Sequence, residues 1–147
     1  MTLATYPDLN GASVFITGGG SGIGASLTEG FLEQGAKVAF VQRSESTAFC
    51  DEMEQKHGAR PLFIPCDITD TAALKAAIAQ AGEAHGDVTV LVNNAANDMR
   101  HATLEVEEDF WDWMIAINQK AYFFAAQAAI PQMQRAGHGS IINFSSI

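Results

Sequence analysis

The first residues whose types and spacing suit ligand binding form a glycine-rich stretch, Thr17–Gly24. It reads Thr-Gly-Gly-Gly-Ser-Gly-Ile-Gly. It follows an apolar run, Ala12–Ile16, and precedes a segment with helical periodicity, Ala25–Gln34. A strand, a glycine turn and a helix place unpaired N–H groups and the positive end of the helix dipole against an anion. Glycine allows φ > 0 and leaves room that a Cβ would fill, so the stretch predicts a pyrophosphate site. The candidate binding residues in it are Thr17, Gly18, Gly20, Ser21, Gly22, Ile23 and Gly24.

One further motif directly follows the fourth predicted strand, and another spans the fifth. They are Asn93–Ala96, which reads Asn-Asn-Ala-Ala, and Gly139–Ser146, which reads Gly-Ser-Ile-Ile-Asn-Phe-Ser-Ser. The glycine spacing is G-x-x-x-G-x-G and not the G-x-G-x-x-G of the commoner dinucleotide fingerprint. The three motifs together resemble the short-chain dehydrogenase/reductase family. The resemblance implies an oxidoreductase that transfers a hydride between a nicotinamide cofactor and an alcohol or carbonyl compound.

The resemblance also implies two catalytic residues. Ser146 aligns with the family's catalytic serine, whose hydroxyl bonds the substrate oxygen and stabilises developing charge. No G-x-S-x-G elbow surrounds it, so it is not predicted to be a nucleophile. Asn118 aligns with a catalytic asparagine that perturbs its helix and holds a water in a proton relay. The alternatives from the residues alone are a polar strand end for Ser146 and a solvated side chain for Asn118.

Further cofactor contacts are carried over from the same resemblance. An aspartate after the third strand contacts the adenine in the family, and here it is Asp67, followed by Ile68. It could instead be a turn or helix-cap aspartate. In the family, the motif after the fourth strand braces the sheet and contacts the cofactor ribose. From the residues alone, it could be only a polar turn. Its residues are Asn94, Ala95 and Ala96, and we expect Ala96 to be tolerated where the family has glycine.

The end of the second predicted strand bears on the choice of cofactor. An aspartate there would bind the ribose 2′-hydroxyl and favour NAD, but this chain has Gln42 followed by Arg43. Arg43 can pair with the 2′-phosphate of NADP, so we expect NADP in preference to NAD. Arg43 could instead stack on the adenine, and a nearby carboxylate, Glu45, would disfavour a phosphate.

The loop Asn97–His101 reads Asn-Asp-Met-Arg-His and is unusually polar. It could be a solvated loop. After Asn-Asn-Ala it resembles the pentose and aldose dehydrogenases of the family, which implies a sugar-like polyol or aldose as the small-molecule substrate. A ketoacyl compound or another ketone is the alternative. The candidate substrate residues are Asn97, Asp98, Arg100 and His101.

Alternating strand and helix patterns predict one α/β domain over residues 1–147, a doubly wound (Rossmann) parallel sheet. We expect the strand order 3-2-1-4-5, with the ligand crevice at the carboxyl ends of the first and fourth strands. The expected strands are Ala12–Ile16, Ala36–Gln42, Pro61–Pro65, Val88–Val92 and Ser140–Phe144. The expected helices are Ala25–Gln34, Ser46–His57, Asp70–His85 and Val106–Ala136, the last with a kink or break at Pro131.

Composition narrows the classes of partner. The net charge of −9 argues against nucleic acid, and no apolar run approaches the ~20 residues of a membrane span. The N-terminal residues do not resemble a signal peptide, so a cytoplasmic protein is expected. Cys50 and Cys66 predict neither a disulfide framework nor a metal site. Six aromatic residues lie in the last predicted helix, which the family packs against a second copy, so we expect a homodimer or homotetramer. Alternatively, they pack under the C-terminal part of the family fold. They are Phe110, Trp111, Trp113, Tyr122, Phe123 and Phe124.

The family's acid/base residue is a tyrosine in a Tyr-x-x-x-Lys motif downstream of the catalytic serine. Neither Tyr6 nor Tyr122 is followed by such a lysine. We therefore expect the sheet to be incomplete relative to the family and the 147 residues alone to be inactive. The alternative is a nucleotide-binding module without catalysis or a truncated inactive member, and more remotely a dehydratase or epimerase. Ser146 and Asn118 together favour the enzyme.

Overall fold

Five parallel strands form the central sheet of the computed structural model, which describes residues 4–145. Their order is β3-β2-β1-β4-β5, which confirms the doubly wound α/β prediction and places the reversal of strand order between β1 and β4. Strands β1 and β4 are buried along their whole lengths because both faces of the sheet are covered. The strands are β1 Ser13–Thr17, β2 Lys37–Gln42, β3 Leu62–Pro65, β4 Val88–Asn93 and β5 Ser140–Asn143.

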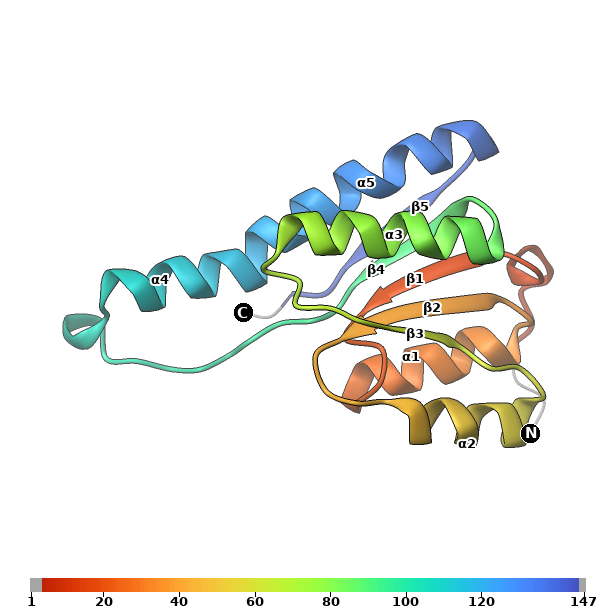
Figure 1. Ribbon diagram of the computed structural model, residues 1–147, viewed down its shortest axis with the longest axis horizontal. Helices are drawn as coiled ribbons and strands as arrows, with labels where there is room; N and C mark the ends of the chain where they lie inside the picture. Colours follow the sequence, from red (N-terminus) through yellow and green to blue (C-terminus); the bar gives the residue numbers. More distant parts are fainter. Residues whose placement is uncertain (1–3, 146–147) are drawn as a thin grey trace.

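Helices cover the sheet on both sides (Figure 1). α1 and α2 lie against one face, and α3 and α5 lie against the other. The element bounds lie within one or two residues of those predicted, apart from the last helix and the start of α1. The helices are α1 Gly22–Glu33, α2 Thr47–His57, α3 Thr71–His85, α4 Glu108–Ile115 and α5 Ala121–Ala136. Three shorter turns are the 3-10 turns Pro7–Leu9 and Thr103–Glu105 and the π-helical turn Ala116–Lys120.

Alternation along β1 and β4 divides the core into two clusters. Phe15 and Leu91 point to the cluster shared with α3 and α5, whereas Val14 and Ile16 point to the cluster shared with α1 and α2. All four side chains are fully buried. The buried strands therefore hold the carboxyl ends of β1 and β4 side by side, where the polar motifs begin.

The segment predicted as one helix over 106–136 is three helical pieces, and its interruption is not at Pro131. α5 continues through Pro131 without a break, and the next residue, Gln132, joins this turn to β4 and α3. The Gln132 side chain accepts a bond from the Val88 N–H and donates one to the Ile78 carbonyl. The interruption lies at the π-helical turn, where the Ala121 N–H donates to the Ala116 carbonyl, five residues back.

One end of the molecule is extended. The segment after β4 and helix α4 project together beyond the sheet (Figure 1). At the sheet edge, β5 pairs with β4 and its four residues are exposed, including Ile141 and Ile142. Within residues 4–145, no helix has both the length and the apolar character needed to cross a membrane.

Candidate functional site

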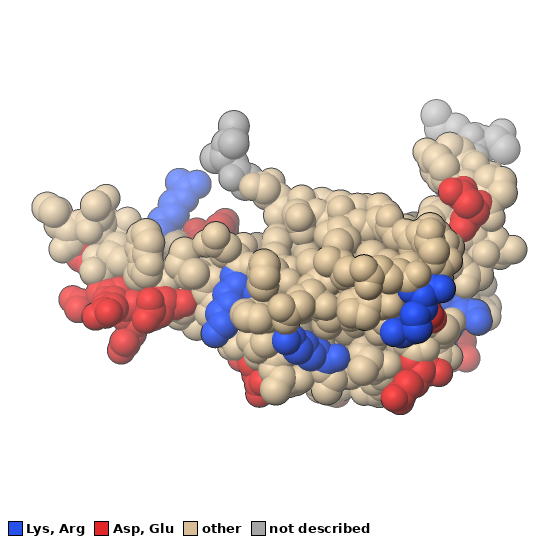
Figure 2. All heavy atoms as spheres, turned by 90° about the horizontal axis from the view of Figure 1, so that it is seen from above, with Lys and Arg blue, Asp and Glu red and all other residues tan. Residues whose placement is uncertain are grey.

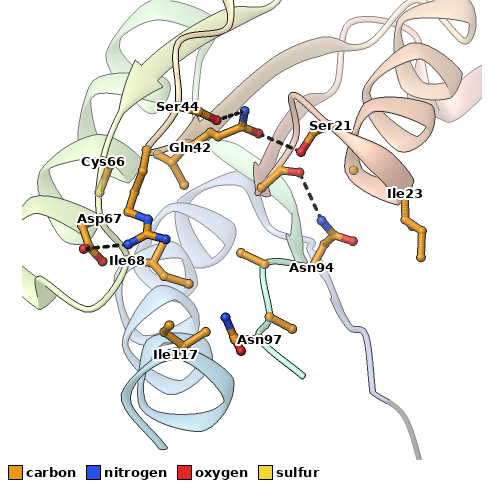
Figure 3. Close-up of a pocket in the computed structure, with 16 residues that line it drawn as sticks. Ser21, Ile23, Gln42, Ser44, Cys66, Asp67, Ile68, Asn94, Asn97 and Ile117 are labelled. Atoms are coloured by element: carbon orange, nitrogen blue, oxygen red, sulfur yellow. Dashed lines mark hydrogen bonds and ion pairs between the residues drawn. The ribbon is translucent and has the colours of Figure 1, made fainter. Parts of the chain in front are cut away.

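A cavity of about 440 Å³ opens at the carboxyl ends of β1, β2, β3 and β4 (Figure 3). This volume lies in the range of small-molecule and cofactor sites, and the place is where ligands bind in open α/β sheets. The glycine turn, the ends of β2 and β3, the segment after β4 and the π-helical turn supply its walls. The lining residues are Gly18, Ser21, Ile23, Gly24, Val41, Gln42, Arg43, Ser44, Cys66, Asp67, Ile68, Asn94, Ala95, Ala96, Asn97 and Ile117.

The glycine turn has the conformation that its sequence predicts. Gly18 and Gly22 have φ of 72° and 53°, a backbone conformation that residues with a Cβ rarely adopt. A Cβ on Gly24 would lie 1.8 Å from the Gly18 carbonyl oxygen, so α1 can pack this closely on the end of β1 only with glycine. The Ser21 side chain makes no capping bond and the first turn of α1 holds no acidic residue. The start of α1 therefore fits a phosphate.

Thr17 joins the end of β1 to the segment after β4. Its buried hydroxyl oxygen accepts bonds from the backbone N–H groups of Asn94 and Ala95, at 2.9 and 3.0 Å. In return, the Asn94 side-chain amide donates to the carbonyls of Thr17 and Gly18, at 3.0 and 3.2 Å. Asn94 thus both lines the cavity and joins β1 to the segment after β4. Thr17 does not line the cavity itself, but its hydroxyl holds the backbone of two residues that do. None of the non-glycine residues in 4–145 has positive φ, so Ala96 is accommodated without that strain, as expected.

Asn118 lies in the π-helical turn and pairs with Asn97. Its side-chain amide oxygen accepts a bond from the Asn97 N–H and its amide nitrogen donates to the Asn97 carbonyl, each at 2.9 Å. Asn118 does not itself line the cavity, but Asn97 and Ile117 do. Asn118 thus lies where the helix departs from α-helical geometry, and its catalytic role stays a prediction.

Ser146 lies outside the described residues, but the strand that leads to it is firmly held. The Phe144 N–H donates to the Asn93 carbonyl at 2.9 Å, and the Asn93 side chain donates to Asn143 at the same distance. The Tyr122 hydroxyl, whose pKa is raised by burial, bonds the Phe144 carbonyl at 3.4 Å. The end of β5 is therefore fixed beside β4.

The predicted substrate loop is divided. Asn97 lines the cavity, whereas Asp98, Arg100 and His101 are exposed and do not. The His101 ring stacks on Phe110 with the ring centroids 3.9 Å apart. That contact attaches the loop to α4 and not to the cavity wall.

The rim of the cavity at β2 and β3 carries opposite charges. Arg43 lies 4.0 Å from Asp67 and both side chains are well exposed, so the pair is weak. The pKa of the Asp67 carboxyl is lowered, chiefly because the Thr69 backbone N–H donates to it. Asp67 thus makes a turn contact while also lining the cavity. Burial raises the pKa of the neighbouring Cys66 thiol to about 11.

Glu45 was expected to disfavour a phosphate, but it does not line the cavity. Its carboxylate accepts bonds from the backbone N–H groups of Ser46 and Thr47, at 2.9 and 2.7 Å, and from the Thr47 hydroxyl. These bonds, that of the Thr47 hydroxyl first, hold the pKa of Glu45 below its usual value. Its negative charge therefore stabilises the N-terminus of α2.

Sequence reasoning missed four lining residues: Val41, Ser44, Cys66 and Ile117. Ser44 and Cys66 are direct neighbours of the predicted Arg43 and Asp67, and Ile117 precedes Asn118. Their place next to predicted site residues is the only feature of the sequence that could have indicated them. Gly20 and Gly22 belong to the glycine turn but do not line the cavity.

Charged groups elsewhere lie apart from this rim. Figure 2 shows Asp and Glu side chains gathered at the end of the molecule that α4 forms. Exposed residues there are Glu105, Glu107, Glu108, Asp109 and Asp112. Glu29, Glu33 and His57 could together reach a cation, but Lys56 and His57 already bond Glu29 and tie α1 to α2.

Residues 12–147 match the sequence model of a family described as short chain dehydrogenase. The chain belongs to the short-chain dehydrogenase family. It is 48% identical to the probable galactose dehydrogenase GalD of Rhizobium meliloti over 151 residues, which cover all of this chain and 59% of that protein. It is 44% identical over 148 residues to a D-xylose 1-dehydrogenase of Caulobacter vibrioides, covering all of this chain and 58% of that one.

Among solved structures of the family, a metagenomic short-chain oxidoreductase in complex with NADP superposes with a TM-score of 0.88 at 32% identity. The match covers 95% of this chain and 64% of the other. The chain thus spans about three fifths of the length of the curated relatives that it matches.

Proposed function

We propose that the protein carrying this chain is an NAD(P)-dependent oxidoreductase that transfers a hydride between nicotinamide and an alcohol or carbonyl substrate. One observation carries the proposal. A single cavity joins a glycine turn suited to phosphate, at Gly18–Gly24, to a backbone segment, Asn97, that Asn118 holds by two hydrogen bonds. Membership of the family and the names of the relatives support it.

The chain's own residues have distinct roles in this proposal. The N–H groups at the start of α1 bind the phosphates, and Asn94, Ala95 and Ala96 form the wall beside the ribose. The Ser146 hydroxyl donates to the substrate oxygen, and Asn118 holds the water of a proton relay. A bound nicotinamide supplies or accepts the hydride.

NADP is the proposed cofactor in preference to NAD. Gln42 stands at the end of β2 where a carboxylate would bind a free 2′-hydroxyl, and the exposed Arg43 lies on the cavity rim with its charge available to a phosphate. The NADP complex of a structural neighbour supports this choice.

A sugar or related polyol is the proposed substrate class. Both curated relatives named above act on sugars according to their names, and the polar segment Asn97–His101 follows the cavity wall directly. Asp98, Arg100 and His101 would have to turn toward the cavity to contact such a substrate.

The test measures binding and turnover in the whole protein. We expect NADPH and NADH to bind in fluorescence titrations, and D-galactose or D-xylose to be oxidised faster than a simple secondary alcohol. Cofactor binding without turnover of any alcohol or carbonyl compound would instead support a nucleotide-binding module.

We further propose that a second copy covers the outer face of α4 and α5. Trp111 and Phe123 are 61% and 63% exposed there, and Ile115 and Ile130 are also exposed. Large exposed aromatic groups on neighbouring helices are typical of a homo-oligomer interface. We expect light scattering to give a dimer or tetramer, and Phe123→Glu to shift it toward monomer. Gln55→Glu, at an exposed polar position on α2 away from this face, is the matched control.

A further inference from the structure

We propose that Gln42 sets the direction of hydrogen bonding at the cofactor's 2′ position, so that the Ser44 hydroxyl donates to a 2′-phosphate. Ser44 is then a cofactor-specificity residue and Gln42 a positioning residue. The proposal rests on the proposed function and names the group of the cofactor that this part of the cavity selects. Figure 3 shows the Gln42 side chain between Ser21 and Ser44.

The orientation of the Gln42 amide follows from the chemistry of its neighbours. The Gly20 backbone N–H, which can only donate, lies 3.1 Å from one end of the amide, so that end is the oxygen. The Ser21 hydroxyl lies on the same oxygen at 3.5 Å. The other end is therefore the NH₂ group, and it donates to the hydroxyl oxygens of Ser44 and Ser46, at 2.8 and 2.9 Å.

This orientation determines what each serine can offer. A hydroxyl that accepts from an NH₂ group keeps its own hydrogen for another acceptor. The Ser46 hydroxyl gives its hydrogen to the Ser44 carbonyl at 3.2 Å. Within residues 4–145, the Ser44 hydroxyl hydrogen finds no protein acceptor, and Ser44 lines the cavity beside Arg43.

Beside Gln42, the cavity wall therefore offers the Ser44 donor and the positive charge of Arg43, whose guanidinium lies 4.0 Å from the Asp67 carboxylate in a weak, exposed pair. A phosphate has only acceptor oxygens and negative charge, so it satisfies both the Ser44 hydroxyl and the Arg43 guanidinium. A free ribose 2′-hydroxyl would seek an acceptor for its hydrogen, and the Gln42 oxygen already accepts from Gly20 and Ser21. The nearby Glu45 carboxylate is turned to the start of α2.

The glycine turn lies close against this network. Ser46 is buried, and a Cβ on Gly20 would lie 2.6 Å from the Ser46 hydroxyl oxygen and 3.0 Å from the Gln42 amide oxygen. The glycine turn thus packs directly on Gln42 and Ser46. The bonding direction at Ser44 is fixed by a backbone N–H and not by a mobile side chain.

Two variants of the whole protein separate the parts of the proposal. Ser44→Ala removes the donor alone, and we expect NADPH binding to weaken about tenfold with NADH binding unchanged. Gln42→Glu keeps the shape but replaces the NH₂ group by an acceptor, which turns the serine hydrogens inward and adds negative charge. It should weaken NADPH binding more than Ser44→Ala does and strengthen NADH binding. Ser26→Ala, at an exposed serine on α1, is the control.

Dissociation constants are measured for NADPH and NADH and for two fragments without nicotinamide, adenosine 2′,5′-bisphosphate and AMP. The same selective loss for NADPH and the bisphosphate in Ser44→Ala supports the proposal. Unchanged preference in Ser44→Ala overturns it, whatever Gln42→Glu does to folding. Equal or tighter binding of NADH by the wild type also overturns it. If neither dinucleotide binds the wild type, the proposed function itself has failed.

Discussion

The side-chain amide of Asn118 pairs with both backbone polar groups of Asn97, twenty-one residues earlier in the chain. The two bonds imitate one rung of a β-ladder, although one partner is a side chain in a helix. They attach the π-helical turn to the segment that leaves β4 and forms the cavity wall. Asn118 is therefore placed to order the backbone of the site as well as any water beside it.

Asn118→Ala removes both bonds to Asn97. We expect the turnover number to fall about 100-fold or more, because proton transfer loses a positioned group and the Asn97 segment loosens. Steady-state kinetics measures this, and hydrogen exchange at residues 97–99 reports the loosening. The exposed neighbour Gln119, changed to Ala, should leave both unaffected. An unchanged turnover number in Asn118→Ala would contradict the assignment.

Gly24→Ala places a methyl group against the Gly18 carbonyl, 1.8 Å away before relaxation. We expect the free energy of unfolding to fall by more than about 2 kcal/mol and cofactor binding to be lost, because α1 must move off β1. Urea unfolding checks the first effect. Gly30→Ala is the matched change in the same helix: a Cβ there meets nothing within 4 Å, so about 0.5–1 kcal/mol should be gained. Equal effects at both positions would refute the close-packing argument.

Much of this architecture is predictable from local sequence. Alternating apolar runs and the glycine turn fix the strand order, because parallel crossovers are right-handed and few topologies remain. The positions of the candidate cofactor residues follow from motifs at strand ends. What local patterns do not contain is a bond between distant residues, such as that of Thr17 with Asn94, seventy-seven residues on.

Three places in the chain show features that local sequence does not reveal. Pro131 predicts a helix interruption from its own chemistry, yet α5 continues through it, and Gln132 joins that turn to β4 and α3. Nothing in the local sequence marks Ser44 as a candidate phosphate contact. That proposal depends on the orientation of the Gln42 amide, which follows from the bond that the Gly20 N–H donates to its oxygen. The polar loop Asn97–His101 looks uniform in sequence, but only its first residue reaches the cavity wall.

Gln132 is a buried amide that satisfies one backbone donor and one backbone acceptor. Gln132→Leu keeps the volume but leaves the Val88 N–H and the Ile78 carbonyl without that partner. We expect a loss of about 2–4 kcal/mol of unfolding free energy, measured in urea. Gln134→Ala, two residues on and exposed, should stay within about 0.5 kcal/mol of wild type. A loss no larger than that of the control would show that the two bonds add nothing.

Glu45 makes stability depend on pH at the start of α2. Its folded pKa lies below the ordinary 4.5, so the carboxylate's contribution is complete above that value and disappears as pH falls through the folded pKa. Glu45→Gln should therefore lower the urea midpoint at neutral pH, and the difference from wild type should shrink in acid. Glu83→Gln, an exposed change on α3, serves as the control. A gap that stayed constant with pH would count against the capping role.

The π-helical turn also has a consequence for how the chain tolerates length changes. It holds one residue more than an α-helical turn, which rotates the faces of α4 by about 100° relative to those of α5. Deleting one residue within Ala116–Lys120 would restore a regular helix with no loop to absorb the change. The backbone could then remain folded while the amide at Asn118 swings away from Asn97. A single-codon deletion at this point would therefore disrupt the geometry of the site while leaving the chain able to fold.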